Sequence, residues 1–242
     1  SNVLFFSLLI FFIIGILDDL FDLTATSRLI VQLIVSYFIW ANDISISVID
    51  ISWLNLDPSY IILPKYISMI FTLLWIVGLT NAINWIDGLD GLAAGVCSIF
   101  LIGLLFIGLR FWDNQLIIMT SGLLGGTLGF LKNNFYPAKI YLGDSGSYLL
   151  GIMVAILSLI SFKPNYPVLE FHLNILFFLV PILDMIIVII SRLKAGISPF
   201  LADRSHFHYR LLSLGISHRR TVIILYLLNI FTSSYVFKLM QN

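Results

Sequence analysis

Eight long apolar stretches constrain this 242-residue chain more than any other feature of its sequence. A helix that crosses a bilayer needs about 20 apolar residues, because each residue advances it by about 1.5 Å. The predicted spans are Asn2–Leu17, Leu29–Ala41, Tyr60–Thr80, Leu92–Leu109, Gln115–Leu131, Tyr148–Phe162, Phe171–Ile190 and Thr221–Phe237. We therefore predict an all-α fold, a polytopic integral membrane helix bundle with about eight transmembrane helices in one domain over residues 1–242.

The composition excludes the other broad classes of protein. Hydrophobic residues make up 60% of the chain and charged residues 11%, against roughly 25% charged in soluble domains. So few polar groups could not cover a soluble domain, and so apolar a chain is not disordered. The net charge is zero, so no basic field favours nucleic acid. The single cysteine, Cys97, excludes an intramolecular disulfide.

The segment between the second and third spans follows a different pattern. Apolar and polar residues alternate from Ile44 to Trp53, which is the period of a β-strand. We expect a small external β-hairpin near residues 44–53, on the membrane surface.

The loops between eight spans alternate between two membrane faces, and charge is divided unevenly between these faces. Loops 18–28, 81–90, 132–144 and 191–220 share one face and hold nine of the 13 Lys and Arg residues. Positive loops mark the cytoplasmic side, so this face is predicted to be cytoplasmic. Seven of the 13 Asp and Glu residues also lie in these loops, six of them in short dense motifs, which indicates a site rather than solubilising charge.

The first motif, Asp18-Asp19-Leu-Phe-Asp22, ends the first span. On a helix, Asp18 and Asp22 share a face one turn apart. Adjacent carboxylates need a cation or a raised pKa. A solvated helix end is the alternative, although acidic residues at a helix C-terminus oppose the macrodipole.

In the second motif, Asn81, Asn84 and Asp87 recur every three residues and can line one side of a helical turn. Asp and Asn oxygens are ligands suited to a hard cation such as Mg²⁺. The alternative is an ordinary turn between spans. A turn accounts for Gly88 and Gly91, but not for two asparagines flanked by apolar residues.

The third motif, Gly143-Asp-Ser-Gly-Ser147, opens the sixth span. Backbone N–H groups at such a helix N-terminus are free to bind an anion. The equally open alternative is that Asp144 or Ser145 caps the helix with its side chain.

The fourth motif places Arg204, His206, His208 and Arg210 within a short loop. These side chains are donors for phosphate oxygens. A zinc site is an alternative, but the motif has no cysteine and only two close histidines. A basic cytoplasmic loop is the other alternative, and it explains the arginines better than the histidines.

Together these parts are typical of phosphoryl transfer, which depends on positioning and charge neutralisation. The runs Asp18–Asp22, Asn81–Gly91, Gly143–Gly151 and Asp203–Tyr209 resemble, in order and spacing, the four signatures of the polyprenyl-phosphate N-acetylhexosamine-1-phosphate transferases, which are of the glycosyltransferase 4 type. The resemblance covers essentially the whole chain. The Asp-Arg-x-His-x-His pattern favours the bacterial undecaprenyl-phosphate GlcNAc-1-phosphate transferase branch over the muramoyl-pentapeptide branch.

This resemblance implies a Mg²⁺-dependent enzyme, with Mn²⁺ as an alternative metal, in the bacterial inner membrane. Such an enzyme transfers GlcNAc-1-phosphate from a cytoplasmic UDP-sugar to undecaprenyl phosphate and releases UMP, as the first membrane step of a cell-surface glycan pathway. A homodimer is compatible with it. The implied catalytic residues are Asp18, Asp19 and Asp87, the metal ligands are Asp144 and Asn84, and the substrate-binding residues are Asn81, Gly88, Leu89, Asp90, Tyr141, Arg204, His206 and His208.

The chain departs from the family pattern in two places. The last motif usually ends in His-His, and here the final position is Tyr209, which puts phosphate binding by that residue in doubt. Family members usually have about two spans before the Asp-Asp motif, and this chain has one. We expect low activity from this chain alone, and a gain when an upstream extension is restored.

A secondary transporter or ion channel is the main rival interpretation. Asp184 lies inside the seventh predicted span, and intramembrane acids mark ion paths in such proteins. Transporter sites, however, lie near the bilayer midplane between inverted repeats. We find no internal repeat, and the polar motifs all fall at one membrane face.

Overall fold

The computed structural model describes residues 2–51, 60–161, 171–199 and 205–240, and most of these residues are helical. Six of the described helices, α1, α3, α4, α5, α6 and α10, are long and apolar enough to cross a membrane, and α2 is a shorter apolar helix. The predicted polytopic helix bundle is therefore confirmed. In chain order the elements are α1 (Asn2–Phe21), α2 (Ala25–Ala41), β1 (Val48–Asp50), β2 (Tyr60–Ile62), α3 (Lys65–Ile86), α4 (Leu92–Phe111), α5 (Asn114–Asn134), α6 (Gly143–Ile160), α7 (Phe171–Phe177), α8 (Leu179–Lys194), α9 (Phe207–Ser213) and α10 (His218–Leu239).

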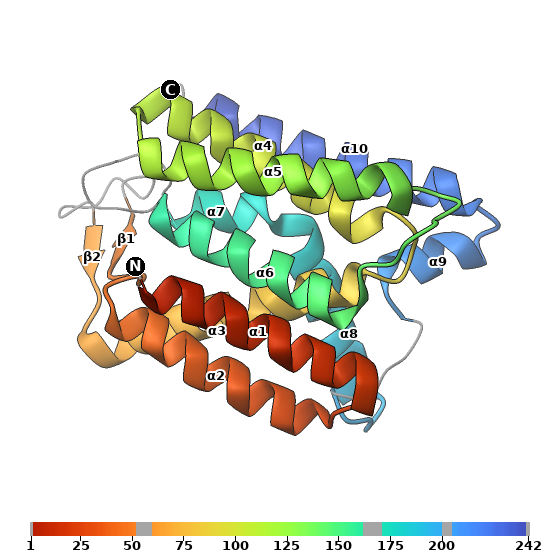
Figure 1. The fold of residues 1–242 in the computed structure, drawn as a ribbon, viewed down its shortest axis with the longest axis horizontal. Helices are drawn as coiled ribbons and strands as arrows, with labels where there is room; N and C mark the ends of the chain where they lie inside the picture. Colours follow the sequence, from red (N-terminus) through yellow and green to blue (C-terminus); the bar gives the residue numbers. More distant parts are fainter. Residues whose placement is uncertain (1, 52–59, 162–170, 200–204, 241–242) are drawn as a thin grey trace.

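The long helices lie side by side, and the chain reverses direction from one to the next (Figure 1). α3 and α6 pack together in the middle of the bundle, with α1 and α2 against one side of this pair. α4 is the most enclosed of the long helices, because α5, α6 and α10 all pack against it. An α-helix bonds all its backbone groups internally, so this arrangement leaves few unpaired backbone groups at membrane depth.

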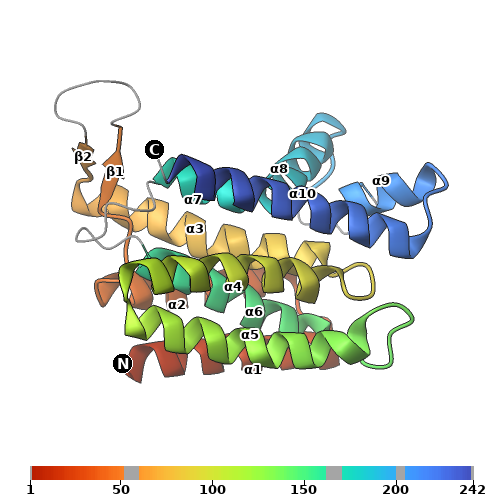
Figure 2. The same cartoon turned by 90° about the horizontal axis from the view of Figure 1, so that it is seen from above.

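The predicted seventh span, Phe171–Ile190, is wrong as a single helix. The chain breaks at Phe178 into α7 and α8, and α8 diverges from the bundle (Figure 2). Pro181 is the physical reason, because proline has no N–H to donate to the carbonyl four residues earlier and its ring clashes there. That carbonyl belongs to Phe177, where α7 ends.

The prediction of a hairpin within residues 44–53 is correct in placing a strand there, but the second strand lies outside this segment. β1 lies in that segment, but it pairs antiparallel with β2, with Val48 opposite Ile62 and Asp50 opposite Tyr60. β2 was predicted as the start of the third span, Tyr60–Thr80. Pro64 precedes α3 directly, and the residue before a proline is disfavoured in helical conformation. The third span therefore begins at Lys65.

Candidate active site

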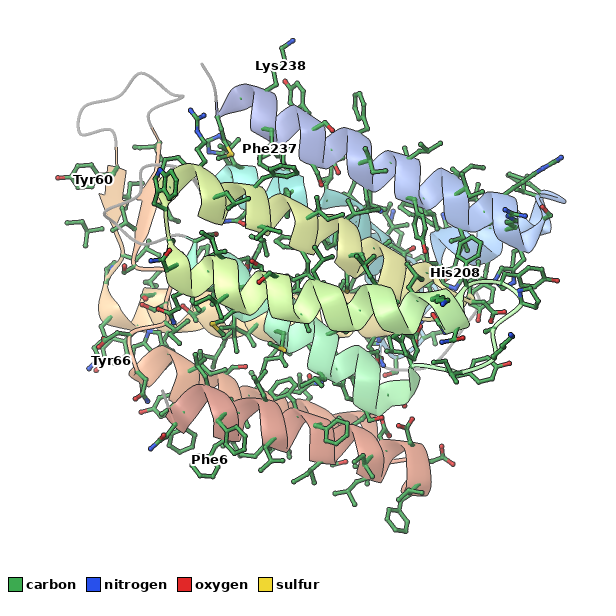
Figure 3. The ribbon with its side chains drawn as sticks, turned by 45° about the horizontal axis from the view of Figure 1, so that its top comes forward. Phe6, Tyr60, Tyr66, His208, Phe237 and Lys238 are labelled. Atoms are coloured by element: carbon green, nitrogen blue, oxygen red, sulfur yellow. The ribbon has the colours of Figure 1, made fainter. Side chains whose placement is uncertain are left out.

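The four sequence motifs meet at one end of the bundle. The end of α1, the α3–α4 and α5–α6 connections and α9 all lie there, opposite the end that carries β1 and β2 (Figures 1 and 2). In Figure 3, His208 lies at this end, whereas Tyr60 and Lys238 lie at the other. The alternation of the spans predicted this gathering of the motifs on one face.

Asp18 is buried and already engaged in three contacts. Its side chain is 3% exposed. It forms an ion pair with Arg28 of α2, and it accepts hydrogen bonds from Tyr148 Oη of α6 at 3.2 Å and from the Leu23 backbone N at 3.0 Å. Asp18 thus joins three segments, α1, α2 and α6. As a general base it would have to release some of these contacts.

Asp19, in contrast, is exposed and contacts the backbone of α6. Its Oδ1 accepts from Asp144 N at 2.8 Å, and its Oδ2 accepts from Ser145 N at 3.1 Å. The expectation that these N–H groups are free for an anion is therefore wrong, because the Asp19 carboxylate accepts both. The alternative of a local side-chain cap is also wrong, because the N-cap position is Leu142 and α6 has no capping side chain of its own.

Asn84 and Asp144, the two predicted metal ligands, are in direct contact. Asn84 Nδ2 donates to Asp144 Oδ1 at 2.6 Å and to Ser147 Oγ at 2.8 Å. This contact joins the last turn of α3 to the first turn of α6. Binding a cation through Asn84 would require its amide to turn so that the oxygen, not the nitrogen, faces Asp144.

Asn81 makes different contacts from Asn84 and Asp144. Its Nδ2 donates to Gln32 Oε1 of α2 at 2.6 Å and to the Val77 carbonyl at 2.8 Å. The three-residue spacing of the motif therefore places Asn81 against α2 and Asn84 against α6. A role of Asn81 in binding substrate stays a prediction.

Four of the residues predicted to bind substrate line one cleft. A cleft of about 280 Å³ lies between the α3–α4 and α5–α6 connections. Asp90 links these two connections, because its Oδ2 accepts a hydrogen bond from Ala138 N at 3.0 Å. Tyr141 is 77% exposed, while the Leu89 side chain is buried in the core. The lining consists of Asp87, Gly88, Leu89, Asp90, Asn134, Tyr141, Leu142 and Gly143.

Asp87 lies at the end of α3, on the wall of this cleft. Burial, with smaller effects from the negative charges of Asp144, Asp19 and Asp90, raises the pKa of its carboxyl to about 8. Like charges disfavour ionisation of a neighbour. Asp144, Asp19 and Asp90 all lie near enough to act on the Asp87 carboxyl, so acidic side chains are concentrated at this end of the bundle.

Asp184 is the partner of His206, and the sequence interpretation missed this role. Asp184 Oδ2 lies 2.7 Å from His206 Nδ1, and Oδ1 accepts from Phe207 N at 2.6 Å. Both side chains are buried. A carboxylate within an apolar segment needs a partner, which was the available signal. With both oxygens engaged in this way, Asp184 gives no support to the transporter interpretation.

His208 packs against the turn that follows α3. A Cβ added at Gly88 would lie 3.1 Å from His208 Cε1 and closer still to Nε2, so any side chain at Gly88 would displace the imidazole. His208 is buried, and its Nε2 has no hydrogen-bond partner among the residues that the structure describes. The structure thus joins the fourth motif to the second through van der Waals contact.

One predicted residue, Arg204, lies outside the described residues. Among the described residues, sequence reasoning also missed Arg28 and Tyr148. Tyr148 follows Asp144 by four residues on α6, so helical spacing places the two side chains on one face. Arg28 is the first basic residue after three aspartates, and a search for their counter-ion would have found it.

The donor set is compatible with Mg²⁺. Within the described ranges, no three His, Cys, Asp or Glu side chains are close enough to form a complete ligand set. Mg²⁺ in phosphoryl-transfer sites typically has only one or two carboxylate ligands, with water and substrate phosphates completing its shell. A cation at Asp144 would also balance the charge that raises the pKa of Asp87. The residues present therefore fit the metal.

The environment of His208 predicts how stability depends on pH. Burial and the neighbouring His206 and His218 lower its pKa from 6.5 to about 4, against an opposing effect of Asp184. The folded protein therefore holds His208 neutral, while the unfolded chain takes up a proton below pH 6.5. The contribution is complete above pH 6.5 and is lost as the pH falls toward 4, by about 3 kcal/mol.

Thermal unfolding in detergent between pH 7.5 and 4 tests this prediction. His208→Gln, which does not titrate, should unfold with a smaller dependence on pH than the wild type. Equal pH dependence in the two proteins would show that His208 is not the responsible group.

The chain was compared with known proteins. The family model for glycosyl transferase family 4 matches residues 1–162. The chain is 36% identical over 221 residues to a probable undecaprenyl-phosphate N-acetylglucosaminyl 1-phosphate transferase of Bacillus subtilis, covering 90% of this chain and 60% of the relative. It is also 36% identical over 237 residues to the decaprenyl-phosphate N-acetylglucosaminephosphotransferase of Mycobacterium leprae, covering 88% of this chain and 58% of the relative.

A more distant branch matches less of the chain. A phospho-N-acetylmuramoyl-pentapeptide-transferase of Lactococcus lactis is 35% identical over 161 residues, which is 61% of this chain and 46% of the relative. The chain thus spans about 60% of the length of the N-acetylglucosamine-1-phosphate relatives, and those relatives match more of it than the muramoyl-pentapeptide relative does.

Proposed function

Because this chain belongs to glycosyl transferase family 4, we propose that it transfers N-acetylglucosamine-1-phosphate from UDP-N-acetylglucosamine to undecaprenyl phosphate. An oxygen of the lipid phosphate bonds to the phosphorus attached to the sugar, and the bond from that phosphorus to the bridging oxygen breaks. UMP leaves with the bridging oxygen. The names of the Bacillus and Mycobacterium relatives support the polyprenyl-phosphate acceptor and the sugar.

One observation supports this function above the others. Asp144 and Asn84 are in contact at 2.6 Å, and the carboxylates of Asp18, Asp19 and Asp87 lie around them at the same end of the bundle. A site for two phosphorylated substrates and a divalent cation needs such a cluster of hard oxygen ligands. When bound, the cation neutralises charge on the diphosphate.

The protein's own groups have separate tasks in this proposal. Asp144 holds the cation, and Asn84 fixes the direction of the Asp144 carboxylate. The cleft walled by Gly88, Asp90 and Tyr141 is the proposed site for uridine, with the exposed Tyr141 ring available to stack on the base. On the acceptor side, Arg28 is ion-paired with Asp18 and part-exposed, so a phosphate oxygen can reach its guanidinium.

We further propose that the site faces the bacterial cytoplasm. Nine of the 13 Lys and Arg residues fall in segments 18–28, 81–90, 132–144 and 191–220, which the sequence predicts to share one face with the motifs, and positive charge marks the cytoplasmic side. UDP-sugars are cytoplasmic, so the donor would reach the cleft without crossing the membrane.

A membrane assay tests the function. Membranes containing the protein are supplied with UDP-GlcNAc labelled in the sugar, undecaprenyl phosphate and Mg²⁺, and the lipid fraction is analysed. We expect labelled lipid to form with one UMP released per sugar, EDTA to stop the reaction, and Mg²⁺ or Mn²⁺ in excess to restore it. Product formation that persists in EDTA would contradict the metal dependence.

The sugar is tested in parallel with UDP-GalNAc and with 6-deoxy-N-acetylhexosamine donors. Faster transfer from either of these donors would change the assignment of the substrate but not of the reaction.

A further inference from the structure

We propose that Asp19 is a positioning residue: its carboxylate caps α6 and thereby aims Asp144, and it does not bind the lipid phosphate. The family resemblance implies a catalytic role for Asp18 and Asp19 alike, so these adjacent residues would be expected to share one task. The inference rests on the proposed function only for the role of Asp144. The cap itself is a feature of the fold.

The first observation is that the two oxygens of the Asp19 carboxylate accept hydrogen bonds from two different N–H groups. The first turn of any α-helix leaves four N–H groups without partners. In α6, Asp144 N bonds Oδ1 of Asp19 at 2.8 Å, and Ser145 N bonds Oδ2 at 3.1 Å. The N-cap position of α6 is Leu142, whose apolar side chain cannot accept a hydrogen bond, so α1 supplies the cap. A carboxylate there is further stabilised by the positive end of the helix dipole.

The second observation is that two glycines make room for this contact. A Cβ at Gly15 would lie 2.6 Å from Ser145 N and 2.8 Å from Asp144 O. Gly15 therefore lets α1 lie directly against the first turn of α6, and Asp19 follows one helical turn later on the same face. On the other side, Gly143 has φ +66°, and its Cβ would lie 3.0 Å from Asp19 Oδ2.

The third observation concerns Asp144, which is held at both its main chain and its side chain. Asp19 holds the Asp144 backbone N, and Asn84 Nδ2 of α3 bonds its Oδ1 at 2.6 Å. The first turn of α6 is therefore fixed by its hydrogen bonds to α1, and the Asp144 carboxylate is oriented toward α3. A group that orients a metal ligand in this way is known to influence metal affinity by 10- to 100-fold.

The same contacts argue against a phosphate bound to Asp19. Each Asp19 oxygen already accepts an N–H of α6, and a phosphate would approach a group of its own charge sign. The cation of this region, Arg28, is bound to Asp18 instead. The two neighbouring aspartates thus have different tasks: Asp18 holds the cation Arg28, and Asp19 holds a helix.

Hydrogen–deuterium exchange of the whole chain in detergent tests the cap without any reaction. The variant is Asp19→Asn, whose amide keeps one accepting oxygen but presents a donor to the second N–H. We expect the amides of residues 144 and 145 to exchange about tenfold faster than in the wild type, the loss typical of a missing cap. Asp22→Asn is the matched control, because Asp22 directly follows the same helix and its side chain is exposed. In this variant the α6 amides should exchange as in the wild type. Unchanged exchange of core amides in α4 verifies that each variant is folded.

Two further measurements separate positioning from phosphate binding. Mn²⁺ alone, titrated by electron paramagnetic resonance, should bind Asp19→Asn at least about tenfold more weakly than the wild type. In the transferase assay, the KM for undecaprenyl phosphate should stay within about twofold while the Mn²⁺ requirement rises. Unchanged exchange at 144 and 145, or a raised acceptor KM with unchanged Mn²⁺ binding, would overturn the inference. A chain that caps as expected yet transfers no sugar phosphate would contradict the proposed function alone.

Discussion

Asp144→Asn is expected to reduce the transfer of sugar phosphate to undecaprenyl phosphate by at least about 10²-fold, the cost of removing one preorganised electrostatic group from a reaction centre. The substitution keeps the shape of the side chain, and its oxygen can still accept from Asn84 Nδ2, which lies 2.6 Å from Asp144 Oδ1 in the wild type. It removes the negative charge that, in the proposed function, would hold the cation. Initial rates of labelled-lipid formation at saturating substrates measure the effect.

Asp113→Asn is the matched control for this change. Asp113 caps α5 by accepting from Leu116 N at 3.0 Å, and asparagine caps a helix about as well as aspartate. The Asp113 variant should retain the wild-type rate. A rate for Asp144→Asn within tenfold of the control would remove Asp144 from the centre of the reaction.

Gly15→Ala is expected to lower the free energy of unfolding by about 1–3 kcal/mol, because the added methyl group overpacks the contact of α1 with α6. The atoms that the new Cβ would meet, Ser145 N and Asp144 O, belong to the backbone of α6. No side-chain rotation can relieve this clash, so the two helices must separate. The midpoint of thermal unfolding in detergent reports the change, and the transferase rate should fall with it as Asp19 moves away from α6.

A glycine on the outer face of α5 provides the control. A Cβ at Gly126 has nothing within 4 Å, so Gly126→Ala adds the same methyl group without a clash. Its unfolding midpoint should equal or exceed that of the wild type, because alanine favours helix over glycine. Similar midpoints for the two variants would mean that α1 and α6 tolerate more separation than the structure indicates.

The fold was predictable to the extent that it depends on hydropathy. A segment such as Leu92–Leu109 is apolar for the length of a bilayer crossing, and α4 forms there. The order of the spans then placed the motifs at one end. The break at Phe178 was not predicted, although Pro181 was visible, because apolar runs remain continuous across a broken helix. The partner of β1 was missed since a three-residue strand has almost no periodicity.

The site was predictable in its residue types but not in its contacts. Asn84 and Asp144 were paired as ligands because their chemistry matches, and they do meet. No local pattern, however, distinguishes Asn84 from Asn81, which turns to Gln32 on another helix. The adjacent Asp18 and Asp19 differ for a similar reason. A helix rotates each successive residue by about 100°, so neighbours in sequence face different helices in the bundle.

The cap on α6 also has a consequence for how the chain assembles during synthesis. Asp18 and Arg28 are ten residues apart, so their ion pair can form as soon as α1 and α2 are both in the membrane. The hydrogen bond from Asp144 N to Asp19 can form only later, because Asp144 is 125 residues further along the chain. Until α6 is inserted, Asp19 and Gly15 of α1 lack the first turn of α6 that they contact. Helix α1 therefore completes its contacts only when α6 is inserted, and any intermediate that lacks α6 leaves the Asp19 carboxylate without the two N–H groups that it caps.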